Sequence, residues 1–119
     1  SFRRKQGLSK NFKFKKFINK TTLLKKNYDL IINASNAGMS HGNKMNRNIL
    51  RLVKKTKAVI DIVYNPLETD LLKEAKKHNI KSIGGLIMLV EQAKPSFEIW
   101  SKKNIEIDDK IYRSLISKI

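Results

Sequence analysis

Apolar residues along the chain gather into three short runs that are typical of buried strands. The runs are "YDLIINAS" (28–35), "AVIDIVY" (58–64) and "IKSI" (80–83). The first two are nearly continuous, as in parallel strands that are buried on both faces of a sheet. The pattern therefore predicts three short strands of a mostly parallel sheet.

Apolar residues at helical spacing occupy the segments between and after these runs. In "NRNILRLVKK" (46–55) they fall on one face, at Ile49, Leu50 and Val53. A second helix is expected after the Asn65–Pro66 turn, with Asn79 as its left-handed stop. Its charges suit the helix dipole: Glu68 and Asp70 in the first turn, and Lys76, Lys77 and His78 in the last.

Two more helices are expected near the end of the chain. Residues 85–100 have an apolar face made by Leu86, Leu89, Val90, Ala93, Phe97 and Trp100. Pro95 lacks an N–H, so a kink or a break is expected there. Residues 107–119 form an amphipathic pattern, with Asp108 and Asp109 near its start.

Alternating strands and helices indicate one small α/β domain with a mostly parallel sheet. The glycine-containing segment 36–43 is expected to be a loop. The first 27 residues are less regular: "FKFKKF" (12–17) fits a short strand and "KTTLLKK" (20–26) a short helix.

The amino-acid composition limits the kinds of functional site that the chain can form. The 119 residues include no cysteine and two histidines, so a disulfide framework and a thiol nucleophile are excluded and no metal site is expected. The longest apolar run, "IGGLIMLV", is too short to span a bilayer. Without a signal-peptide pattern, the sequence predicts a cytoplasmic protein with no membrane partner.

The formal charge of +16 is concentrated at the N-terminus, because the first acid is Asp29. Such a block could attract nucleic acid, a membrane or a phosphorylated ligand. However, 21 of the 26 basic residues are lysines, which fits a compositional bias. Nucleic-acid recognition leans more on arginine forks and stacking aromatics, so a nucleic-acid partner is not the favoured interpretation.

Small polar residues lie where the two long predicted strands end. Asn33 and Ser35 close the first strand, and Tyr64 follows the second. Ligands of open α/β sheets bind at the carboxyl ends of the strands, so these residues are candidates for a binding site. Ordinary turn chemistry explains Asn33 and Ser35 equally well, and Tyr64 could simply cap the core.

Gly85, Met88 and Gln92 share one stripe of the helix that starts at Gly85. Gly85 leaves room for a ligand to approach the helix N-terminus, and Gln92 offers two donors and an acceptor. Core filling by Met88 and surface exposure of Gln92 remain alternatives. Together with the strand ends, the stripe indicates a cleft for a nucleotide and a polar small molecule.

From about Tyr28 onward, the chain resembles the shikimate dehydrogenases. The resemblance is carried by "DLIINASNAGM" and "DIVYNPLETDLLKEAKKHNIKSIGGLIMLVEQAKPSFEIW", followed by a closing helix. That family reduces 3-dehydroshikimate to shikimate with NADPH. The resemblance implies that residues 1–119 are the C-terminal portion of a Rossmann-like NADP-binding domain, with a closing helix segment from about 101 to 119.

The resemblance also implies roles for single residues. Tyr64 and Gln92 match positions that contact shikimate. Five others match positions along the cofactor: Asn33, Ser35, Ile62, Gly85 and Met88. Near the N-terminus, Arg3, Arg4 and Lys5 are similar to the motif that holds the 2′-phosphate of NADP, where a guanidinium can bind phosphate bidentately.

Parts of the family pattern are missing. Neither the glycine-rich strand-to-helix turn nor the domain that carries the catalytic lysine and aspartate occurs, so no catalytic residue is assigned. The expected fold is a partial Rossmann-like sheet without its first strand, which needs a missing N-terminal domain or a complementary chain to act. A nucleic-acid-binding module and a non-catalytic remnant remain the alternatives.

Overall fold

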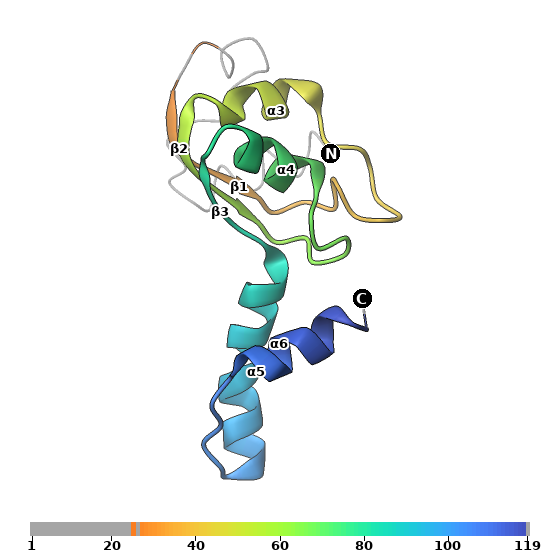
Figure 1. Ribbon diagram of the computed structural model, residues 1–119, viewed down its shortest axis with the longest axis vertical. Coiled ribbons are helices and arrows are strands. Elements are labelled where there is room, and N and C mark those ends of the chain that lie inside the picture. The colour runs from red at the N-terminus through yellow and green to blue at the C-terminus, as the bar shows by residue number, and fades with distance from the viewer. Residues whose placement is uncertain (1–24, 26, 119) are drawn as a thin grey trace, which may run out of the picture.

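The computed structural model describes Lys25 and residues 27–118 (Figure 1). The expected strand 12–17, the expected helix 20–26 and the phosphate-binding candidates Arg3, Arg4 and Lys5 lie wholly or mostly outside the described residues. In the described part, no helix is long and apolar enough to cross a membrane. That part also holds no cluster of three or more metal-ligating side chains.

Three parallel strands form the sheet, in the order β1-β2-β3. Their bounds are Tyr28–Asn33 for β1, Thr56–Asp61 for β2 and Lys81–Ile83 for β3. The register places Ile31 opposite Val59, and Asn33 opposite Asp61. The parallel α/β architecture predicted from the sequence is therefore confirmed.

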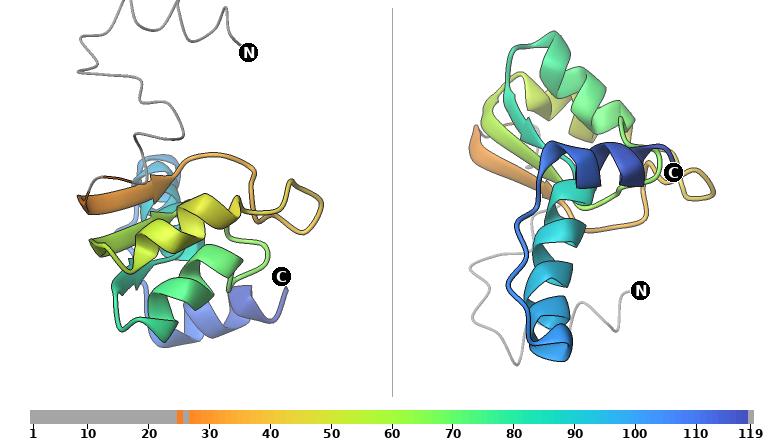
Figure 2. Two further views of the ribbon diagram at one scale, coloured as in Figure 1. Left: turned by 90° about the horizontal axis from the view of Figure 1, so that it is seen from above. Right: turned by 60° about the horizontal axis from the view of Figure 1, so that its bottom comes forward.

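Helices α3 (Arg47–Val53) and α4 (Asp70–Lys77) cover one face of this sheet. The core between these helices and the sheet contains Met45, Val53, Val59, Leu71 and Ala75. Figure 2 shows both helices on the same side of the strands. Because each strand alternates its side chains between two faces, only half of each strand contributes to this core.

The prediction that residues 28–35 form a strand buried on both faces is wrong. Strand β1 ends at Asn33, and Leu30 and Ile32 on its second face are 43% and 56% exposed. The apolar run was interpreted as doubly buried because parallel strands usually are. In the described residues no helix packs on that second face of the sheet.

Helix α4 begins at Asp70, later than its charge pattern predicted. Thr69 is its N-cap, and its Oγ1 accepts a hydrogen bond from the Leu72 N–H at 3.3 Å. Glu68 therefore precedes the helix instead of lying in its first turn, and it contacts Lys76 Nζ at 3.3 Å. The predicted stop is confirmed, because Asn79 adopts a positive φ of 55°.

Helix α5 (Gly85–Ser101) leads away from the sheet, and α6 (Asp109–Ile116) lies beside it (Figure 1). The expected break at Pro95 is absent, since the helix runs through it. The Tyr112 hydroxyl donates to Glu91 Oε1 at 3.3 Å and so joins α6 to α5. Partial burial and the neighbouring Glu91 carboxylate raise the pKa of Tyr112.

The predicted apolar face of α5 is buried only at its start. Leu86 and Val90 are 8% and 6% exposed, whereas Phe97 and Trp100 are 49% and 82% exposed. The helix leaves the sheet as it proceeds. Among the described residues, its second half contacts the returning chain, where the Ile105 N–H donates to Glu98 Oε1 at 3.2 Å.

Candidate functional site

Asp61 is the centre of the polar structure at the carboxyl ends of β1 and β2. Its side chain is fully buried. The carboxylate accepts hydrogen bonds from Asn33 Nδ2 at 2.8 Å, from the Val63 N–H at 3.1 Å and from Thr69 Oγ1 at 2.6 Å. These bonds tie together β1, the segment after β2 and the start of α4, which compensates for burying a carboxylate.

Asn33 connects this hydrogen-bond network to the loop that follows β1. Its Nδ2 also donates to the Ala37 carbonyl at 2.9 Å. Its Oδ1 accepts from the Ser35 N–H at 3.2 Å and from Ser35 Oγ at 2.7 Å. Both donors and both acceptor positions of the amide are thus occupied, so Asn33 shapes the loop and retains no hydrogen bond for a ligand.

Ser35 is exposed, and its hydroxyl forms hydrogen bonds within the same loop. Besides donating to Asn33, Ser35 Oγ accepts from the Ala37 N–H at 3.2 Å. A cleft of about 500 Å³ opens beside this loop, between the end of β1 and the start of α3. Its lining combines the apolar Ile31 and Ile49 with the charged Lys44 and with Ala34 and Ser35.

At the same end of the sheet, the loop after β1 also contacts the loop after β2. Ser40, after β1, donates its N–H to the Asn65 carbonyl at 3.1 Å and its hydroxyl to Asn65 Oδ1 at 2.7 Å. Asn65 directly follows Tyr64. The two bonds therefore fix the loop that carries Tyr64 against the loop that follows β1.

Tyr64 and Gln92 are both exposed, Tyr64 to 43%. Neither side chain makes a hydrogen bond within the described part of the chain, in contrast to the saturated Asn33. Their hydroxyl and amide groups are therefore available to a polar ligand. In the described part of the chain no hydrogen bond joins them to each other; Tyr64 lies past β2 and Gln92 lies two turns into α5.

Gly85 is required by close packing of α5 on the end of β2. A Cβ at this position would lie 2.1 Å from the Ile62 carbonyl oxygen and 2.7 Å from the Val63 carbonyl oxygen. The Gly85 N–H donates to the Val63 carbonyl at 3.2 Å. Its small size is thus explained by the backbone of Ile62 and Val63, in the segment that follows β2. The expectation that Gly85 lets a ligand approach the start of the helix stays a prediction.

This close approach brings Ile62 and Gly85 into contact, with the half-buried Met88 one turn further along α5. The structure thus joins the candidates in two groups: Asn33 with Ser35, and Ile62 with Gly85. Sequence reasoning assigned no role to Asp61, Thr69 or the Ser40–Asn65 pair. An acid inside the apolar run "AVIDIV" was the available signal, since a buried charge needs partners.

Known proteins share this chain's sequence and fold. A shikimate dehydrogenase (NADP(+)) of Methanococcus maripaludis is 45% identical over 96 residues, which are 78% of this chain and 34% of that protein. The chain is homologous to part of the shikimate dehydrogenases. No family model matches it.

Solved structures agree with the sequence comparison. A chorismate mutase/shikimate 5-dehydrogenase fusion protein from Clostridium acetobutylicum has a TM-score of 0.71 and 34% identity, covering 84% of this chain and 38% of that one. A shikimate dehydrogenase in complex with NADP+ has a TM-score of 0.59 and 39% identity, covering 76% of this chain and 31% of that one. The chain spans about a third of the length of these proteins, and the partial Rossmann-like fold is confirmed. The nucleic-acid-binding alternative is not favoured.

Proposed function

We propose that this chain is the C-terminal part of an NADP-dependent shikimate dehydrogenase, which reduces 3-dehydroshikimate to shikimate. The observation that carries the proposal is the 45% identity over 96 residues to a shikimate dehydrogenase (NADP(+)). The free polar groups of Tyr64, just after β2, and of Gln92, two turns into α5, support it. Open α/β sheets bind their ligands at this end.

In this proposal, NADPH supplies the hydride when bound, and the chain holds and orients the reactants. Ile62, Gly85 and Met88 form a mostly apolar wall where β2 meets α5, which suits a flat nicotinamide ring. The cleft lined by Ser35 and Lys44 offers a hydroxyl and a cation to the sugar-phosphate part of the cofactor. Tyr64 and Gln92 hold the hydroxyl and carboxylate groups of the substrate.

The chain's own residues supply binding but not proton transfer. The family's catalytic lysine and aspartate belong to a domain that this sequence does not contain. We therefore expect the 119-residue chain to have no turnover by itself, and to act with an N-terminal catalytic domain or a complementary chain. Activity of the pure chain with NADPH and 3-dehydroshikimate would contradict this part of the proposal.

A chimera tests the function directly. In it, residues 28–119 replace the matching segment of the Methanococcus maripaludis shikimate dehydrogenase, within one polypeptide. We expect NADP+ reduction that depends on shikimate, followed at 340 nm. Tyr64→Phe and Gln92→Ala should each raise the KM for shikimate about tenfold, as expected when a ligand hydrogen bond is lost.

Tyr112→Phe is the matched control, because it removes a tyrosine hydroxyl of α6 that contacts Glu91 of α5. It should leave the KM unchanged. A folded chimera without activity would refute the proposed function and favour a non-catalytic remnant. For the full-length chain, Arg4→Glu should weaken NADP+ binding, whereas nucleic-acid binding with steep salt dependence would favour the alternative.

A further inference from the structure

Tyr64 lies between two residues whose backbones are fixed by hydrogen bonds. On one side, Val63 is buried, and its N–H and its carbonyl form hydrogen bonds of 3.1 Å and 3.2 Å. On the other side, Asn65 accepts from the N–H of Ser40 at 3.1 Å and from the Ser40 hydroxyl at 2.7 Å. The side chain of Tyr64 is exposed and forms no hydrogen bond within the described residues. Its placement therefore depends on these two neighbours in the chain.

The two fixed neighbours of Tyr64 differ in how they are held. Val63 is bonded to the buried carboxylate of Asp61 and to the N–H of Gly85 at the start of α5, so its position belongs to the core. Asn65 is held at the surface by a single residue, Ser40, which lies 25 positions earlier in the chain. The bond between the Ser40 hydroxyl and Asn65 can therefore be removed while the core remains intact.

The loop that carries Ser40 is itself compact. The Gly38 N–H donates to the Asn43 carbonyl at 2.7 Å, which closes the loop on itself. The chain also passes so close to itself at Gly42 that a Cβ there would collide with the carbonyl oxygen of Asn36. A loop that is closed in this way gives Ser40 a fixed position, from which its two hydrogen bonds hold the segment that follows β2.

We propose that Ser40 is a positioning residue for the substrate. Through Asn65 it holds the Tyr64 hydroxyl in the place where that hydroxyl binds a polar group of the substrate, and it acts through these two residues instead of binding the ligand. This rests on the proposed function, in which Tyr64 contacts the substrate. A side chain that is held in place before the ligand arrives loses less conformational entropy on binding, so the affinity for the ligand is higher.

Kinetics of the chimera with the Methanococcus maripaludis shikimate dehydrogenase test this role. Ser40→Ala should raise the KM for shikimate about fivefold, as expected for the loss of one hydrogen bond, and change the KM for NADP+ by no more than about twofold. Ser40→Thr retains the hydroxyl and should restore the KM for shikimate. Ser117→Ala is the matched control, because that exposed hydroxyl also donates to one acceptor, the Ser114 carbonyl at 2.8 Å, but does so on α6.

A double-mutant cycle shows whether Ser40 acts through Tyr64. In a chimera that already carries Tyr64→Phe, Ser40→Ala should raise the KM for shikimate by no more than about twofold, because the hydroxyl that Ser40 positions is no longer present. The same rise in both backgrounds would overturn the proposal, since Ser40 would then support the fold in general. An equal rise of the KM values for shikimate and NADP+, or an equal effect of Ser117→Ala, would overturn it as well.

A second measurement on the full chain needs no catalysis. The chain has three tyrosines, and fluorotyrosine labelling gives each a fluorine NMR signal; the signal of Tyr64 is the one that Tyr64→Phe removes. Ser40→Ala should shift or broaden this signal and leave that of Tyr112 unchanged. An unaltered Tyr64 signal refutes the positioning role, whether or not the chimera is active. An active chimera whose KM for shikimate is insensitive to Ser40→Ala refutes that role alone, whereas a folded, inactive chimera refutes the proposed function.

Discussion

Asn33 and Asp61 face each other across the carboxyl ends of β1 and β2, with Asn33 Nδ2 2.8 Å from Asp61 Oδ1. The pair is buried, and each member has further partners in a different loop. One hydrogen bond thus connects the loop after β1 to the start of α4. The rim where the ligand-binding candidates lie is held in shape by this buried pair, and the side-chain amide of Asn33 has no hydrogen bond left for a ligand.

Asp61→Ala should destabilise the chain by about 3 kcal/mol or more, because it leaves three buried donors without an acceptor. Chemical denaturation monitored by circular dichroism measures the change. Asp70→Ala is the control: Asp70 is an exposed acid in the first turn of α4, and its loss should cost about 0.3–1 kcal/mol through the helix dipole. Equal effects of the two substitutions would show that the buried network does not hold the fold together.

Thr69→Ala should cost about 1–2 kcal/mol, because Thr69 is both the N-cap of α4 and a donor to Asp61. Thr69→Ser retains the hydroxyl and should lose much less. In a double-mutant cycle, Thr69→Ala and Asp61→Ala should be non-additive, since they share one hydrogen bond. Simple additivity of the two free energies would mean that the cap and the carboxylate act independently.

Gly85→Ala should destabilise the chain by about 1–3 kcal/mol, since the new methyl group meets the backbone of Ile62 and Val63 and α5 must move away from β2. Gly84→Ala is the matched control. Its Cβ would lie 3.3 Å from Leu72 Cδ1, the flexible end of a side chain that can shift, and at an ordinary 3.8 Å from the Leu67 carbonyl oxygen. In the active chimera, Gly85→Ala should also raise the KM for NADP+. Equal tolerance of both alanines would argue against close β2–α5 packing.

The sequence predicted the order and the type of the described elements, because the apolar runs and the helical spacing have clear periods. It also found Asn79 as a helix stop, where a left-handed residue is needed. It could not predict the open second face of β1, because a doubly buried parallel strand and a half-exposed one have the same apolar run. The difference depends on what packs against Ile32, which lies outside the local pattern.

The site was predicted as a set of positions but not as an arrangement. Resemblance placed Asn33 along the cofactor, whereas the structure shows its amide saturated by Asp61, Ser35 and Ala37. Similarly, the size of Gly85 is dictated by the carbonyl groups of Ile62 and Val63, just after β2. Both facts depend on contacts between segments about 20–30 residues apart, and no local spacing rule contains them.

Ser40→Ala should loosen the two loops at the rim while leaving the core unchanged. The substitution removes the hydroxyl bond to Asn65 but keeps the backbone bond between the same residues. Its cost should be about 1 kcal/mol or less. Hydrogen exchange should accelerate at the amides of Gly38, Met39 and Gly42, and stay unchanged in α4.

Ser114→Ala on α6 serves as a control, because that exposed serine uses its backbone carbonyl and not its hydroxyl. Faster exchange in both variants would point to a general loss of stability.

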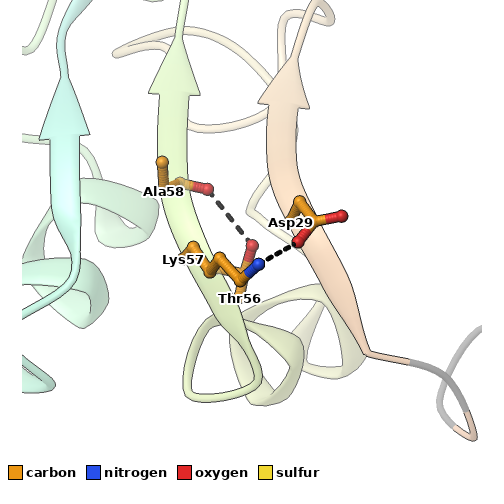
Figure 3. Close-up of polar contacts among 4 residues, drawn as sticks. All are labelled: Asp29, Thr56, Lys57 and Ala58. Carbon is orange, nitrogen blue, oxygen red and sulfur yellow. Dashed lines mark hydrogen bonds and ion pairs between the residues drawn. The ribbon is translucent and has the colours of Figure 1, made fainter.

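The exposed ion pair between Lys57 and Asp29 joins β1 to β2 at 2.7 Å, near the amino ends of the strands (Figure 3). The hydrogen bond and the positive charge of Lys57 lower the pKa of Asp29, and the same contact raises the pKa of Lys57. A lowered carboxyl pKa stabilises the fold at pH values above the unfolded pKa, and this contribution is lost as the pH falls through the folded pKa. The raised lysine pKa contributes below the unfolded lysine pKa and is lost as the pH rises through the folded one.

Asp29→Asn should therefore lower the Tm slightly at neutral pH and have no effect in strong acid, where Asp29 is protonated in both states. The effect at neutral pH should be small, and it should shrink further in 1 M salt, because both side chains are solvated. Thermal unfolding of the two proteins from pH 2 to pH 8 gives the difference. Asp109→Asn is the control. Asp109 is an exposed acid that is not paired with a lysine, so this variant measures the effect of removing a negative charge without breaking an ion pair. If the difference in Tm between the wild-type chain and Asp29→Asn persists in strong acid, Asp29 acts through its shape or as a neutral hydrogen-bonding group, and not as the ionic partner of Lys57.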